Sequence, residues 1–354
     1  LRNRKERLSA CYDQIIKSFK SELEQDGKLA VQLSLPQGEA LSADHQQTII
    51  ELLRKKPDEE CYQYLDEELL MLVLQSLSQG SQKTDMIHNV LFYGIEQGYL
   101  KLCGQLINDP DIDVNRIKLI IGNKMTALIK AAIYGRKDIV ELLLKDPGID
   151  VNFKDSYGRT ALEKAAEMGH KDVVALLLKD ERVDVNGEGP HKNALLLAAI
   201  YGRKDIVELL LKDPGIDVNF KDSYGRTALE KAAEMGHKDV VALLLKDERV
   251  DVNGEGPHYN ALLEAAIHGH KDVAVILLKD ERFSVNIRSY GMNALQYAAE
   301  HGRKDVVALL LKDKRVTVSG GPLVMAAAHG HKDVVALLLK LSLIHISEPT
   351  RHAS

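Results

Sequence analysis

The feature that most constrains this chain is a long internal repeat. Residues 131–191 are identical to residues 198–258 at every one of 61 positions, at an offset of 67 residues. A catalytic site is one constellation of different side chains, so an unchanged copy favours a surface that is built by repetition. The sequence therefore predicts an elongated array of stacked units.

A Val-Asn dipeptide sets the period of this array. Its valines are Val114, Val151, Val185, Val218, Val252 and Val285, with Val318 before a serine at the next place. Their spacings are 37, 34, 33, 34, 33 and 33 residues. Such a period is typical of small helical units that bury their apolar faces only against neighbours. The 67-residue offset is two units, so a pair was copied as a block, by recent duplication, by design or by an assembly error.

One unit, residues 159–186, shows how its first helix is specified. Thr160 is placed to cap this helix, and Leu162, Ala165 and Ala166 form an apolar stripe of mostly small side chains. Small side chains let the helix approach its neighbours closely. Gly169 is placed to end the helix.

A second helix follows in the same unit. His170 opens it, Asp172 lies in its first turn and Lys179 in its last, which suits the helix dipole. Residues 173–178 are apolar around most of the helix, which predicts packing on both sides. The polar stretches FKDSYGR and GEGPHK that follow Val-Asn predict hairpin-like turns.

These units resemble ankyrin repeats. The run Thr160-Ala161-Leu162-Glu163 stands where that family has Thr-Pro-Leu-His, and AAEMGHKDVVALLLK followed by VDVN matches its two helices and outgoing strand. Alanine replaces the proline throughout, and the loops KDPGI and KDERV carry extra residues. The resemblance covers residues 86–340 as about eight repeats, the first and last degenerate. It implies an all-α solenoid of stacked helix-turn-helix units with short hairpin turns.

The two ends of the chain do not repeat. Residues 1–85 predict a helical N-terminal region of no recognised family, with helices near 5–25, 42–56 and 58–79. We expect this region to cover the apolar face of the first repeat. Residues 341–354 break the register after Lys340 and resemble translated adapter sequence. They predict a non-native or disordered tail, with the native C-terminus lost.

Composition argues against several classes of function. The chain carries 47 basic and 52 acidic residues, only 5% aromatics and no tryptophan, which gives no case for binding nucleic acid. Apolar runs such as residues 69–74 are far too short to span a bilayer, so we expect no membrane insertion. Three scattered cysteines and a charged N-terminus without a signal-peptide pattern predict reduced thiols and a cytoplasmic monomer.

Short motifs that resemble metal-binding, dinucleotide-binding or phosphate-binding sequences are more simply explained as turns. His-Gly-His occurs at residues 268–270 and 329–331, but no Cys-x-x-Cys or His-Glu-x-x-His motif accompanies it. We interpret these histidines as inter-helix turn residues that satisfy backbone groups. GEGPHK lacks the third glycine of a dinucleotide fingerprint, and GSQKT lacks the first glycine of a phosphate loop. No catalytic residue, metal site or cofactor is expected.

The ankyrin resemblance implies that the first helices and the turns line a concave face where partners bind. Units that present Ile-Tyr alternate with units that present Glu-Met, so apolar stations alternate with charged ones. The alternative is that the isoleucines and tyrosines only pack against the next helix. The expected contact residues are Ile133, Tyr134, Met168, Leu197, Ile200, Tyr201, Met235, Ile267, His268 and Tyr297.

The predicted function is therefore a non-catalytic scaffold or adaptor that binds another protein through this ankyrin surface. An alternative is a regulatory ankyrin fragment of a larger enzyme or channel, truncated at its C-terminus. A third is a designed or misassembled array, which rests on the 61-residue identity.

Overall fold

The computed structural model describes residues 81–110, 112–187, 193–254, 260–318 and 321–347, together with Glu67, Leu70 and Met71. The helices predicted near 5–25 and 42–56, and most of 58–79, lie outside these residues. The chain divides into two compact units, Leu1–Tyr157 and Gly158–Ser354, which we describe in turn.

In the first unit, two helix pairs flank a β-hairpin. The pairs are α6 (Ser81–Gln97) with α7 (Leu100–Ile107), and α8 (Ala127–Ile133) with α9 (Lys137–Leu144). Strands β1 (Lys118–Ile120) and β2 (Asn123–Met125) pair antiparallel between them. Helix α6 begins at Ser81, so it crosses the boundary that the sequence predicted at residue 85.

Residues of the N-terminal region contact the first helix pair. The Leu102 backbone N–H donates to the Glu67 carboxylate at 2.9 Å, which satisfies an N-terminal donor of α7. Leu70 is fully buried. That residues 1–85 cover the apolar face of the first repeat stays a prediction, since most of them lie outside the described residues. Burial raises the pKa of the nearby Cys103 thiol to about 12, which keeps this free cysteine protonated.

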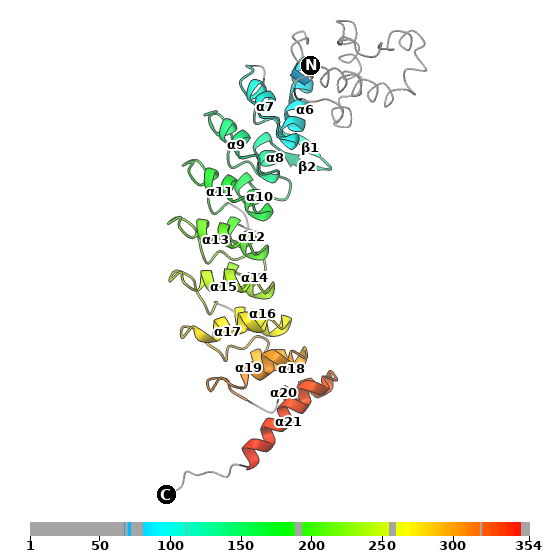
Figure 1. Ribbon diagram of the computed structural model, residues 1–354, viewed down its shortest axis with the longest axis vertical. Helices are drawn as coiled ribbons and strands as arrows, with labels where there is room; N and C mark the ends of the chain where they lie inside the picture. Colours follow the sequence, from blue (N-terminus) through cyan, green and yellow to red (C-terminus); the bar gives the residue numbers. More distant parts are fainter. Residues whose placement is uncertain are drawn as a thin grey trace, which may run out of the picture. The chain divides into compact units, whose positions relative to one another are not determined.

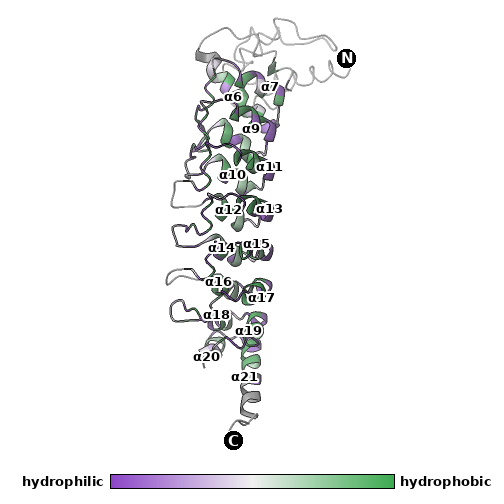
Figure 2. Ribbon diagram, turned by 90° about the vertical axis from the view of Figure 1, so that its left-hand side faces the viewer, coloured by the Kyte–Doolittle hydropathy of each residue, from purple (hydrophilic) through white to green (hydrophobic). Residues whose placement is uncertain are grey.

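In the second unit, helix pairs repeat along the array (Figure 1). The first helices, which pack against one another in sequence order, are α10 (Ala161–Met168), α12 (Ala194–Ile200), α14 (Ala228–Glu234), α16 (Ala261–His268), α18 (Ala294–Glu300) and α20 (Gly321–Ala328). The second helices are α11 (Lys171–Leu177), α13 (Lys204–Leu210), α15 (Lys238–Leu244), α17 (Lys271–Lys279), α19 (Lys304–Leu310) and α21 (Lys332–Ser347). Figure 2 shows hydrophobic residues gathered on the helices and hydrophilic ones along the loops. The predicted all-α solenoid is confirmed.

The caps that the sequence predicted are present. Thr160 caps α10: its hydroxyl accepts from the Glu163 N–H, and the Glu163 carboxylate accepts from the Thr160 N–H at 2.8 Å. This reciprocal pair is a capping box. Gly169 ends the helix in the left-handed conformation, with φ of 88°. The same box recurs at Thr227 on α14.

The second helices are less enclosed than the sequence predicted. In α11, Val173, Val174 and Leu177 are buried, whereas Leu176 and Leu178 are only half-buried. One side of these helices remains partly open to solvent, so the expectation of apolar packing around most of the helix is wrong for those two leucines.

The residue after each helix-ending glycine links one repeat to the preceding one. The His237 Nε2 lies 2.9 Å from the Ile200 carbonyl oxygen at the end of α12, and Arg303 reaches the Ile267 carbonyl at 2.7 Å in the same way. These contacts satisfy carbonyls that the helix end leaves open. His270 and His331, the second histidines of the two His-Gly-His motifs, make the same contact, so for these two the expected role in the inter-helix turn is confirmed. His268 instead ends α16.

The asparagines of the Val-Asn motif join neighbouring loops. The Asn186 side-chain amide donates to the Gly215 carbonyl at 2.8 Å and accepts from the Asp217 N–H at 2.7 Å. Asn219 and Asn253 make the equivalent pair of bonds one repeat and two repeats later. The period of Val-Asn is thus the period of an inter-repeat hydrogen-bond ladder.

The last helix continues into the segment that the sequence set apart. Helix α21 extends to Ser347, although the repeat register is lost after Lys340. Residues 341–347 are therefore helical rather than disordered, and residues 348–354 lie outside the described part of the chain. That the tail is non-native stays a prediction.

Candidate protein-binding surface

A row of large apolar side chains lies at the C-terminal ends of three adjacent first helices. Met168, Tyr201 and Met235 are 41%, 45% and 48% exposed. They occupy equivalent positions, and α10, α12 and α14 pack side by side. Exposed apolar groups that are aligned on a rigid scaffold are suited to contact with another protein. We call these three residues the Met-Tyr-Met row.

Ion pairs flank this row on α10. The Glu167 carboxylate lies 2.8 Å from the Arg159 guanidinium and 3.2 Å from the Lys164 ammonium. It also accepts a hydrogen bond from the Tyr201 hydroxyl at 3.2 Å, which ties the aromatic ring to the preceding helix. Burial, followed by the Glu167 charge, raises the pKa of Tyr201.

The same arrangement recurs on α14. The Glu234 carboxylate pairs with Lys231 and, at 3.3 Å, with Arg226. Both lysines of these sites, Lys164 and Lys231, are buried. Their pairing offsets part of the cost of removing a charge from water.

Two buried carboxyls lie on first helices, Glu230 in the first turn of α14 and Glu264 on α16. Burial raises the pKa of Glu230 to about 7, against a hydrogen bond from the Thr227 N–H that lowers it. Burial also raises the pKa of Glu264 to about 7, and the neighbouring Glu234 carboxylate adds to the shift. The His268 Nδ1 lies 3.6 Å from the Glu264 carboxylate.

Two of the predicted contact residues are in the core. Leu197 is fully buried, and Tyr297 is 4% exposed with its hydroxyl donating to the Ser289 carbonyl at 3.0 Å. Both occupy the fourth position of a first helix, which points between neighbouring helices. The structure therefore places them out of reach of a partner. Ile200 and Ile267 are half-buried, and His268 is exposed.

In the first unit, Tyr134 is exposed and Ile133 is half-buried. The Lys130 Nζ lies 5.7 Å from the centre of the Tyr134 ring, 5.6 Å from that of Phe92 and 2.9 Å from the Glu96 carboxylate. A lysine over an aromatic face is a cation–π contact.

Three exposed tyrosines at the turns were not among the expected contact residues. They are Tyr157, Tyr224 and Tyr290. Tyr290 has a φ of 50°, in the left-handed region that is costly for a bulky side chain. The Ser-Tyr-Gly motif that these three turns share could have identified them.

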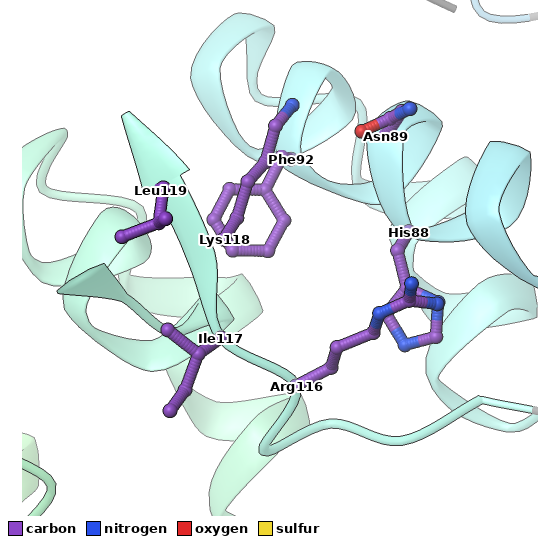
Figure 3. Close-up of a pocket in the computed structure, with 7 residues that line it drawn as sticks. All are labelled: His88, Asn89, Phe92, Arg116, Ile117, Lys118 and Leu119. Carbon is purple, nitrogen blue, oxygen red and sulfur yellow. The ribbon is translucent and has the colours of Figure 1, made fainter. Parts of the chain in front are cut away.

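A hollow of about 380 Å³ lies between α6 and β1 (Figure 3). Its walls come from His88, Asn89 and Phe92 on α6 and from residues 116–119 on the strand side. Phe92 is buried, and the Lys118 Nζ lies 5.4 Å from the centre of its ring.

The described residues contain neither a group of metal-ligand side chains nor a helix that could span a membrane. Over those residues, no group of three or more His, Cys, Asp or Glu side chains is arranged to hold a metal ion. Among the described helices, none has the length and apolar content needed to cross a bilayer.

The stacked helix pairs identify the chain as a helical-repeat protein. Its exposed helix ends and turns are the surfaces that a partner protein could contact. The family model described as "Ankyrin repeats (3 copies)" matches residues 91–188, 184–256 and 252–320. The chain belongs to the ankyrin-repeat family, whose repeats are generally protein–protein interaction modules and typically non-catalytic. No curated protein matches the chain.

Proposed function

We propose that the chain is a non-catalytic scaffold or adaptor that binds a partner protein through the Met-Tyr-Met row and the residues beside it. The observation that carries the proposal is the alignment of Met168, Tyr201 and Met235 at equivalent exposed positions on adjacent helices. We further propose that it acts in the cytoplasm as a monomer and does not bind nucleic acid.

The geometry favours Tyr201 as the central anchor. It occupies the middle helix of the three that carry the row, and its hydroxyl donates a hydrogen bond to Glu167. A rigid aromatic side chain loses little conformational freedom on binding, and truncation of such anchors commonly costs about 2 kcal/mol or more. That corresponds to roughly thirtyfold in dissociation constant. Ile200, Ile267 and His268 extend the proposed contact along the same helices, as do Ile133 and Tyr134 in the first unit.

An affinity pull-down from the source cells with the full chain as bait, followed by mass spectrometry, would identify the partner. Tyr201→Ala combined with Met235→Ala should fold normally and lose that partner about thirtyfold or more. Tyr224→Ala is the matched control, because this exposed tyrosine lies at a turn of the same unit.

Retained capture by the double variant, with capture lost in the control, would move the binding site to the turns. A lower melting temperature of the double variant would show that these side chains belong to the core.

A further inference from the structure

The hairpin of the first unit exposes apolar side chains on an unusually long turn. Residues 116–126 carry three more residues than the equivalent turns, and Ile117 and Leu119 are 46% and 68% exposed, with Ile121 fully exposed. Leu119 lies on β1, Ile117 precedes the strand and Ile121 follows it in the turn, so the three exposed side chains lie along one short stretch of the hairpin. Apolar groups at an exposed turn of a polar loop are uncommon and suggest contact with a ligand.

The register leaves the outer edge of β1 open. Ile121 and Gly122 both have positive φ, as in the two-residue type I′ turn, so Ile120 and Asn123 form the closing hydrogen-bonded pair. Leu119 and Lys124 are then a non-bonded pair, whose backbone groups point outward.

The two outer edges of the hairpin differ. On β2 the outward Lys124 N–H donates to the Ser156 hydroxyl at 2.9 Å, so the following turn occupies that edge. On β1 no described residue pairs with the outward N–H and C=O of Leu119. An open strand edge is a template for pairing with another extended chain.

The hollow beside β1 supplies room for side chains of an added strand. It lies along the same residues, 116–119, that form the open edge, and its opposite wall is α6 (Figure 3). The Phe92 ring and the Lys118 stem give it apolar surface. A strand on this edge would place alternate side chains towards α6 and away from it.

Charge favours an acidic occupant. Residues 115–126 contain three basic side chains, Arg116, Lys118 and Lys124, and no acidic one, in a chain whose net charge is −5. Opposite charges on neighbouring strands stabilise a sheet, and like charges destabilise it. A second copy of this hairpin would bring its own three basic side chains to the same edge.

We propose that the open edge of β1 is a second binding site, which takes an extended, acidic segment of a partner protein as a third strand. The backbone of Leu119 supplies the pairing hydrogen bonds. The hollow receives one apolar side chain of the segment, and the basic hairpin selects its charge. This site is separate from the Met-Tyr-Met row and does not depend on it.

The test uses a fluorescein-labelled peptide of alternating glutamate and valine, titrated into the full chain by fluorescence anisotropy. The peptide should bind, and the Leu119 amide should become protected from hydrogen exchange. A matched peptide with lysine in place of each glutamate should bind at least about tenfold more weakly, since its charges repel the hairpin.

Two changes isolate the backbone pairing. Leu119→Pro removes the outward N–H at an edge position where proline is tolerated, and should weaken binding about tenfold. Leu119→Val keeps both that N–H and an apolar side chain, and should change binding about threefold or less. N-methylation of one alternate set of peptide amides should abolish binding, and N-methylation of the other set should not. This last comparison does not depend on the fold of the proline variant.

Several results would overturn the proposal. They are an absence of peptide binding, equal binding of the lysine peptide, and equal effects of both methylation patterns. Protection of the Leu119 amide in the free chain would also overturn it, because the edge would then be covered already. Sedimentation would tell whether a second copy or the chain's own N-terminal region covers it.

Discussion

Replacement of Glu230 by glutamine should remove a pH-dependent cost of folding. Glu230 is buried, and its pKa is raised from 4.5 to about 7. A carboxyl whose pKa is higher in the folded state favours folding while it is protonated. Its contribution is complete below pH 4.5 and is lost as the pH rises through 7. Glu264, with a pKa also raised to about 7, acts in the same direction.

The size of the effect follows from the shift. Each pKa unit corresponds to about 1.4 kcal/mol, so ionisation of Glu230 lowers the free energy of unfolding by about 3 kcal/mol between pH 4.5 and pH 8. Glutamine keeps the capping geometry without the charge. The chain itself shows this at α18, where the Asn293 N–H donates to the Gln296 side-chain oxygen at 3.0 Å.

Urea unfolding followed by far-UV circular dichroism at pH 5 and pH 8 measures the difference between Glu230→Gln and the wild type. The variant should be more stable at pH 8 by up to about 3 kcal/mol and nearly unchanged at pH 5. The reverse change, Gln296→Glu, is the matched control and should destabilise the chain at pH 8 more than at pH 5. A loss of stability in Glu230→Gln at pH 8, or an equal change at both pH values, would refute the reasoning.

Three further changes test the packing. Leu177→Ala should cost about 2 to 5 kcal/mol in a denaturant melt, because Leu177 is fully buried, and its half-buried neighbour Leu176→Ala should cost clearly less. Asn219→Ala removes two inter-loop hydrogen bonds and should cost about 1 to 3 kcal/mol, with faster hydrogen exchange at the Asp251 amide. Gly236→Ala should lower the melting temperature by several degrees, because φ there is 76° and an added Cβ would lie 2.7 Å from the His270 ring.

Short-range signals in the sequence were sufficient to predict the helices and the repeat architecture. Thr160 and Gly169 mark the start and end of α10 because a cap depends on a few adjacent residues. The Val-Asn period marked the repeats because Asn186 and its equivalents bond to neighbouring loops at that spacing. The family of the chain was predictable for the same reason.

Burial of individual side chains was not predictable in this way. Leu197 and Tyr201 lie four residues apart on one helix, yet the first is fully buried and the second is 45% exposed. The difference arises where α12 meets α10 and α14, which sequence periodicity does not specify. The Met-Tyr-Met row therefore includes Tyr201 but excludes Leu197. The partial burial of Leu176 likewise depends on how its helix packs against its neighbours.

The two copies of the repeated block show why identical sequence does not give identical surface. Tyr134 and Tyr201 are the same position of the 61-residue block, and the residues just before the block are Lys130 and Leu197. The Lys130 Nζ lies 5.7 Å from the centre of the Tyr134 ring, whereas the position equivalent to Lys130 in the second copy is Leu197, and the Tyr201 hydroxyl donates to Glu167. The same tyrosine is thus set beside a positive charge in one unit and bonded to a carboxylate in the other. A partner that contacted both would meet two chemically different anchors, although the copied sequence around them is the same.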